Sequence, residues 1–141
     1  PYLLDEHDQE QGGLGILLEV ALQTSNMREA GEPPHVLSRG EAAAAMYWSA
    51  AQILTHHASN GCNLQAGDLI GTGTLSTAEE SGLGSLLEIS RGGKEPVRLP
   101  NGETRSFLED GDELTLSARC EADGAVPIGL GSCCGRVLPA R

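Results

Sequence analysis

Hydrophobic and polar positions alternate along residues 16–24, where Ile16, Leu18, Val20 and Leu22 fall on one face. A period of two residues is typical of a β-strand that buries one of its faces. The sequence therefore predicts a half-buried strand at residues 16–24.

A helical pattern begins at residues 38–41, which have the Ser-x-x-Glu form of a capping box. The run of alanines that follows has high helix propensity, and later apolar positions recur at helical spacing. We therefore predict one main helix over residues 42–59. Because Tyr47 and Trp48 are two of only four aromatic residues in the chain, we expect them to anchor this helix on a sheet.

From residue 68 onward, short apolar runs are separated by turns that contain glycine, a pattern typical of antiparallel β-structure. Asn101-Gly102 and Asp110-Gly111 are turn dipeptides that accept a positive φ angle. The predicted strands cover residues 68–75, 86–90, 97–99, 113–120 and 126–138. Together with one main helix, they predict a mainly β, α+β fold that forms a single domain over residues 1–141.

Composition and charge exclude several classes of function for this chain. The formal net charge is -11, from 20 acidic and 9 basic residues, so a nucleic-acid or anionic-membrane partner is not expected. No apolar run reaches the roughly 18 residues of a membrane span. The four cysteines lack the spacing of a zinc site and are expected to be reduced thiols in a cytoplasmic protein. The chain starts at Pro1 without a methionine, and we expect it to be part of a longer one.

The candidates for chemistry are few. The glycine-rich residues 71–74 lack the third glycine of a dinucleotide site and the lysine of a P-loop. Ser76 has no nucleophile elbow around it, which disfavours a serine hydrolase. Glu88 lies in an apolar run and needs a partner if it is buried, although an acid in such a run more often alternates onto the solvent face. Thr74 carries a hydroxyl that could bind a ligand, but a β-branched residue in a strand usually needs no function.

Longer stretches of the sequence resemble one family. They include residues 55–76, residues 104–113, residues 129–139 and the run Gly84-Ser85-Leu86-Leu87-Glu88, and residues 1–3 and 18–24 also fit bacterial-type members. These stretches resemble the carboxyl-terminal part of the fumarylacetoacetate hydrolase family. The resemblance covers nearly the whole chain and implies a mixed β-sandwich roll, of which this chain would hold an incomplete portion.

The resemblance also implies a reaction, the hydrolysis of a carbon-carbon bond in 4-fumarylacetoacetate to fumarate and acetoacetate, which ends tyrosine and phenylalanine breakdown. In the family, Ca2+ or Mg2+ on acidic ligands stabilises the developing enolate, and a histidine activates water. The acid at the Glu88 position orients that histidine, so the resemblance gives Glu88 a catalytic part. The threonine at the Thr74 position helps to bind the substrate. A homodimer is implied by the same analogy.

The family's metal ligands and its catalytic histidine would precede Pro1, so we expect no metal site in this chain and no activity from it alone. None of His7, His35, His56 and His57 matches that histidine. Two alternatives stay open. The chain could be a non-catalytic structural or binding module derived from the fold, or it could belong to a related acylpyruvate hydrolase.

Overall fold

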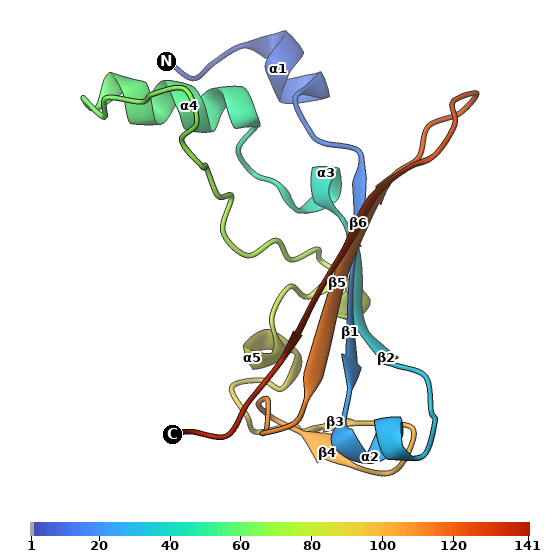
Figure 1. The fold of residues 1–141 in the computed structure, drawn as a ribbon. Helices are drawn as coiled ribbons and strands as arrows, with labels where there is room; N and C mark the ends of the chain where they lie inside the picture. Colours follow the sequence, from blue (N-terminus) through green and yellow to red (C-terminus); the bar gives the residue numbers. More distant parts are fainter. Residues whose placement is uncertain (1) are drawn as a thin grey trace.

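The computed structural model describes residues 2–141 and consists of one four-stranded antiparallel sheet, a two-stranded ribbon and several short helices (Figure 1). The sheet has the order β2-β1-β5-β6 and is built from β1 (Ile16–Gln23), β2 (His35–Glu41), β5 (Glu113–Cys120) and β6 (Ile128–Arg136). The ribbon pairs β3 (Val97–Arg98) with β4 (Thr104–Arg105). The helices are α1 (Glu6–Gln11), α2 (Ser25–Glu29), α3 (Ala42–Ala45), α4 (Ala50–Ser59), α5 (Leu86–Ile89) and the 3-10 turn η1 (Glu80–Gly82). The predicted α+β class is confirmed.

Strand β1 lies inside the sheet, with antiparallel neighbours on both sides. Its partner β5 pairs along its full length, from Ile16 opposite Cys120 to Gln23 opposite Glu113. The strands predicted at residues 16–24, 113–120 and 126–138 are confirmed; the ends of β5 are as predicted, β1 ends one residue earlier, and β6 is two residues shorter at each end. The turn at Asn101-Gly102 also forms, with Gly102 at φ +87.

The buried core is small and lies at the end of the sheet where α2 and the β3-β4 ribbon pack (Figure 1). Its fully buried members are Leu22, Met27 and Leu99, surrounded by the partly buried Leu37, Val97 and Leu114. Thr24 caps α2 by accepting a hydrogen bond from the Met27 amide at 3.1 Å. The same hydroxyl donates to Glu103 beside the ribbon, which ties α2 to the β3-β4 turn.

The helix prediction at residues 38–41 is wrong at its start. Ser38 and Gly40 belong to β2 and pair with Val20 and Leu18 of β1. The chain then forms α3, leaves helical geometry at Met46 with ψ 120, and starts α4 after Ser49. The working capping box is Ser49 with Gln52, since each side chain bonds the backbone amide of the other residue. The predicted helix over residues 42–59 is therefore two helices.

Tyr47 and Trp48 lie in the break between α3 and α4 and do not anchor a helix on the sheet. Tyr47 is 83% exposed and Trp48 is 47% exposed, and their rings meet edge to face with centroids 4.7 Å apart. Helix α4 extends away from the sheet (Figure 1). The expectation that Tyr47 and Trp48 anchor the helix on a sheet is therefore wrong, because such an anchor needs a sheet surface within reach. No helix formed by residues 2–141 is long and apolar enough to cross a membrane.

Two predicted strands are also wrong. Residues 68–75 run as irregular chain, and Gly73 at φ +79 interrupts any regular extended conformation. Residues 86–89 form helix α5, because Ser85 caps the first turn by accepting a hydrogen bond from the Glu88 amide. The local cap decides the conformation here, although the residues between are apolar.

Candidate functional site

Glu88 lies in the first turn of α5 and is exposed to solvent. Its backbone amide bonds Ser85 Oγ at 3.2 Å, so the start of the helix fixes where its side chain begins. A carboxylate in the first turn of a helix also faces unsatisfied amide groups and the positive end of the helix dipole. The strand prediction had placed Glu88 inside an apolar stretch, and the structure replaces this with a carboxylate at a helix start.

Two serine hydroxyls donate to the Glu88 carboxylate. Ser85 Oγ lies 2.6 Å from Oε2, and Ser76 Oγ lies 2.9 Å from Oε1 and 3.0 Å from Oε2. These hydrogen bonds, first that of Ser85 and then that of Ser76, lower the pKa of Glu88 below its usual value, because they stabilise the charged form. Glu88 is therefore held as an ionised acceptor.

The loop before α5 brings Ser76 to this position. The amide of Thr77 donates to the carbonyl of Gly82 at 3.0 Å, and the amide of Gly84 donates to Ser76 Oγ at 3.0 Å. A Cβ atom added to Gly84 would lie 2.2 Å from the Leu75 carbonyl oxygen and 2.7 Å from Thr74 Cγ2. Only glycine permits so close an approach, so the segment that carries Thr74 packs directly against the residue that precedes Ser85.

Thr74 and Glu88 thus belong to one unit, which consists of the loop at residues 74–85 and helix α5. Thr74 is exposed, and it lies two residues before Ser76. Among the described residues, the side chains that donate to the Glu88 carboxylate are those of Ser76 and Ser85. His56, in contrast, lies on α4, where its Nδ1 atom is 2.9 Å from the Tyr2 hydroxyl.

Sequence reasoning missed Ser85 as a partner of Glu88, although a signal was present. Residues 85–88 have the same Ser-x-x-Glu form as residues 38–41, where the sequence analysis placed its capping box. At residues 85–88 the serine caps a helix, but the glutamate side chain bonds the serine hydroxyl. The sequence marks Ser76 only as a possible nucleophile, because its role as a donor to Glu88 depends on how the loop closes.

The residues that the structure describes do not fit a metal centre. Within residues 2–141, no three histidine, cysteine, aspartate or glutamate side chains gather closely enough to hold an ion. Ca2+ and Mg2+ need several oxygen ligands at one point, and the Glu88 surroundings supply one carboxylate and two hydroxyls that already donate to it. We therefore derive no step of a reaction from a metal bound to these residues.

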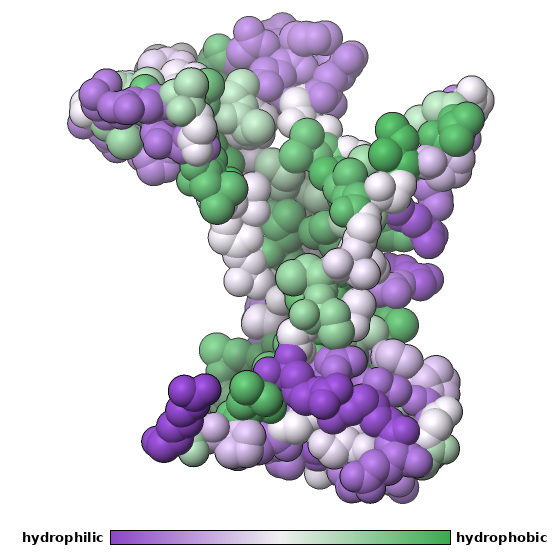
Figure 2. Space-filling model, in the orientation of Figure 1, coloured by the Kyte–Doolittle hydropathy of each residue, from purple (hydrophilic) through white to green (hydrophobic). Residues whose placement is uncertain are grey.

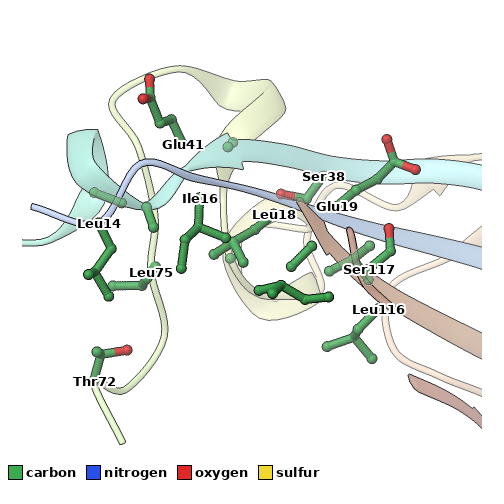
Figure 3. Close-up of a pocket in the computed structure, with 18 of the residues that line it drawn as sticks. Leu14, Ile16, Leu18, Glu19, Ser38, Glu41, Thr72, Leu75, Leu116 and Ser117 are labelled. Carbon is green, nitrogen blue, oxygen red and sulfur yellow. The ribbon is translucent and has the colours of Figure 1, made fainter. Parts of the chain in front are cut away.

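A cavity of about 590 Å³ opens beside this unit, over one face of the sheet (Figure 3). Its labelled wall residues Leu14, Ile16, Leu18 and Leu75 point their side chains into a shared space, whereas the Glu41 carboxylate points away (Figure 3). Leu75 and Gly84 border the cavity, but neither Thr74 nor Glu88 is among the described residues that line it. The cavity supplies apolar surface, and the polar chemistry lies at its margin.

Comparisons with known proteins agree with the resemblance. Residues 30–138 match the family model of the fumarylacetoacetate hydrolase carboxyl-terminal region. The fumarylacetoacetase of Bos taurus is 46% identical over 140 residues, which are 99% of this chain and 31% of the relative. The fumarylacetoacetase of Homo sapiens is 53% identical over 95 residues, which are 67% of this chain and 22% of the relative. The fumarylacetoacetase of Dictyostelium discoideum is 43% identical over 136 residues, which are 94% of this chain and 30% of the relative.

The chain spans less than a third of the length of these relatives. The match of the family model extends over most of the chain, and the Bos taurus relative aligns with nearly all of it. The chain belongs to the fumarylacetoacetate hydrolase family, within its carboxyl-terminal region.

Proposed function

We propose that the protein containing this chain hydrolyses 4-fumarylacetoacetate to fumarate and acetoacetate, and that this chain supplies one wall of the active site. The observation that carries the proposal is the ionised Glu88 carboxylate, held by two hydroxyls beside Thr74. The family membership supports the reaction class, because the curated relatives are named fumarylacetoacetase. This reaction belongs to tyrosine and phenylalanine catabolism.

Glu88 acts in this proposal as the acid that orients a histidine base. Attack of water on a carbonyl carbon needs a base that removes a proton, and an adjacent carboxylate stabilises the imidazolium that forms. The carboxylate must stay ionised to do so, and the serine hydrogen bonds favour that state by lowering the pKa of Glu88. Its exposure leaves room for the histidine to approach.

Thr74 acts in this proposal as a donor to a substrate oxygen. Its side chain is exposed, and the close approach of Gly84 limits where the Thr74 backbone can lie. A hydroxyl in a fixed position adds affinity and direction to a polar substrate at little cost in ordering. The apolar cavity beside residues 72–75 could take the less polar parts of the ligand.

The remaining parts of the site are proposed to come from the protein upstream of residue 1. They are the catalytic histidine and the carboxylates that would hold Ca2+ or Mg2+. The relatives are about three times longer than this chain, which leaves ample sequence for these groups. We further propose a homodimer in the cytoplasm, which the exposed apolar surface and the four free cysteines support.

The test is Glu88→Gln in the protein expressed from its complete reading frame. Loss of substrate absorbance measures turnover. We expect kcat to fall about 10²- to 10⁴-fold, because the amide keeps the shape of the side chain but cannot balance the charge of an imidazolium. The matched control is Glu80→Gln, which removes an exposed carboxylate six residues before the α5 start and should change kcat less than twofold.

Equal kcat values for Glu88→Gln and the unmodified protein would reject this role for Glu88. A protein that leaves 4-fumarylacetoacetate intact but hydrolyses shorter acylpyruvates would favour the related hydrolase. Failure on both substrate classes would favour a non-catalytic module.

A further inference from the structure

Each of the two serines beside Glu88 accepts a hydrogen bond from a backbone amide and donates one to the Glu88 carboxylate. A serine hydroxyl has one proton to donate and lone pairs to accept with. Ser76 Oγ accepts the Gly84 amide at 3.0 Å, and Ser85 Oγ accepts the Glu88 amide at 3.2 Å. Because a backbone donor points at each oxygen, the single proton of each hydroxyl is left to point at the carboxylate.

These bonds leave part of the carboxylate open. A carboxylate has about four lone-pair positions, and two serine protons fill two of them. Ser85 addresses Oε2 at 2.6 Å, and the single proton of Ser76 is shared between Oε1 at 2.9 Å and Oε2 at 3.0 Å. Oε1 therefore retains free acceptor capacity, and the side chain of Glu88 is exposed. A further N–H donor can bind there without displacing either serine.

We propose that Ser76 and Ser85 are positioning residues, which hold the Glu88 carboxylate in one orientation and leave Oε1 available to the histidine N–H. This inference rests on the proposed function of Glu88. Neither serine touches the substrate in this scheme. They act through Glu88, in the way that hydrogen-bonded neighbours orient the ligands of other active sites.

A purely structural role would explain less of the geometry. Capping of α5 needs only an acceptor at Ser85, and it does not need the Ser85 proton to reach Oε2 at 2.6 Å. Ser76 lies outside any helix terminus, yet its hydroxyl links the Gly84 amide to a carboxylate 12 residues away in sequence. The lowered pKa of Glu88 has these two side chains as its largest causes. Both hydroxyls thus converge on the one group with proposed chemistry.

The experiment compares Ser76→Ala, Ser85→Ala and their double variant with Ser76→Thr and Ser85→Thr in the protein from the complete reading frame. We expect each alanine variant to lose about tenfold in kcat with KM changed less than twofold, because a hydrogen bond to a charged group is lost. Threonine retains the hydroxyl and should restore most of kcat. Ser81→Ala is the control, since Ser81 is an exposed serine of the same loop.

The pH profile separates positioning from general stability. Both serines favour the ionised form, so their removal raises the pKa of Glu88. ¹³C NMR titration should therefore give a higher Glu88 pKa in the alanine variants and a return toward the value of the unmodified protein in the threonine variants. Loss of folding would lower kcat without such a shift in the Glu88 titration, and unfolding midpoints measured in parallel identify that loss.

Two results overturn the inference. If Glu88→Gln abolishes turnover while both alanine variants keep the kcat of the unmodified protein, the proposed function stands and the positioning role fails. If the protein does not hydrolyse the substrate, the proposed function fails, and ¹³C NMR titration of Glu88 still decides on the serines. An unchanged Glu88 titration in the double alanine variant would then overturn the inference, whereas a raised pKa supports it.

Discussion

At Gly84 the main chain approaches residues 74 and 75 so closely that a side chain does not fit. A Cβ atom there would lie 2.2 Å from a carbonyl oxygen, which cannot rotate away as a flexible side chain could. The same glycine donates its amide to Ser76, so its position controls both the Thr74 segment and the hydroxyl that binds Glu88. Because Gly84 has no side chain, both the approach to residues 74 and 75 and the bond to Ser76 can form.

Gly84→Ala should separate these two segments. We expect a loss of about 1–3 kcal/mol in the free energy of unfolding, as for other overpacked sites. We also expect a fall in kcat, since Ser76 moves away from Glu88. Urea denaturation and turnover measure the two effects. Gly71→Ala is the control, because a Cβ atom at Gly71 meets nothing within 4 Å; equal effects of the two substitutions would contradict the role of Gly84.

Thr74→Val tests the proposed substrate contact with a side chain of the same shape. Loss of one hydroxyl donor should weaken binding by about 1 kcal/mol, or roughly fivefold in KM, with a smaller change in kcat. Steady-state kinetics on the protein from the complete reading frame give both values. Thr104→Val, on the exposed side of β4, should leave KM unchanged. A Thr74→Val protein with an unaltered KM and kcat would remove Thr74 from the site.

At the scale of elements, the Ser-x-x-Glu pattern occurs in a strand at residues 38–41 and in a helix at residues 85–88. The pattern describes how a helix could start, but it cannot reveal whether a neighbouring strand competes for the same backbone groups. Residues 38–41 have β1 as a partner. Residues 85–89 have no ladder partner in the described part of the chain, so the local cap wins there. Tertiary pairing overrides local preference in β2.

A buried ion pair holds the β3-β4 ribbon against the start of β5. Arg105 Nε lies 2.8 Å from Asp112 Oδ2, and Arg105 Nη2 lies 3.1 Å from Oδ1. Both residues are buried, and Asp112 raises the pKa of Arg105 by hydrogen bonding to it. Asp112 also accepts the Glu109 amide at 2.9 Å, which closes the turn that precedes β5. The pair links two elements through one carboxylate.

Asp112→Ala should leave the buried Arg105 charge with only its longer ion pairs to Glu103 and Glu109, at 3.5 Å each. We expect the free energy of unfolding to fall by about 3 kcal/mol, the low end for buried pairs that lose one member, because these two carboxylates offset part of the loss. Asp110→Ala, which removes an exposed aspartate from the same turn, should cost less than about 1 kcal/mol. Chemical denaturation of both variants measures the difference. Similar midpoints for the two would show that the pair has no special weight.

At the scale of the whole molecule, residues 2–141 expose far more surface than a compact chain of this mass. The accessible surface is 9744 Å², whereas a folded monomer of 14.7 kDa exposes about 6,900 Å². Apolar side chains gather over the narrow middle of the molecule (Figure 2), and large apolar residues on β5 and β6, such as Leu116 and Leu130, are exposed. This surface is suited to being covered by further protein.

Under the proposed function, the 141-residue chain expressed alone should show no hydrolysis of 4-fumarylacetoacetate, with or without Mg2+, whereas the protein from the complete reading frame should hydrolyse it. The physical reason is that the proposed function places the metal ligands and the catalytic histidine outside this chain, while Ser76 and Ser85 are the described donors to Glu88. An absorbance assay at matched protein concentrations compares the two. Clear turnover by the isolated chain would refute the division of the site between two parts of the protein.

The sequence by itself determined the α+β class, the three long strands around residues 16–24, 113–120 and 126–138, and the family. Alternation with a period of two is a local property, and it survives because each strand finds antiparallel partners. Thr74 and Glu88 were also named from the sequence, through resemblance. Only the tertiary structure decided what surrounds them. The hydrogen bond from Ser76 to Glu88 joins residues that are 12 apart in sequence, and the loop between them can close only because Gly84 has no side chain. The hydrophobic periodicity of the sequence does not predict such a contact.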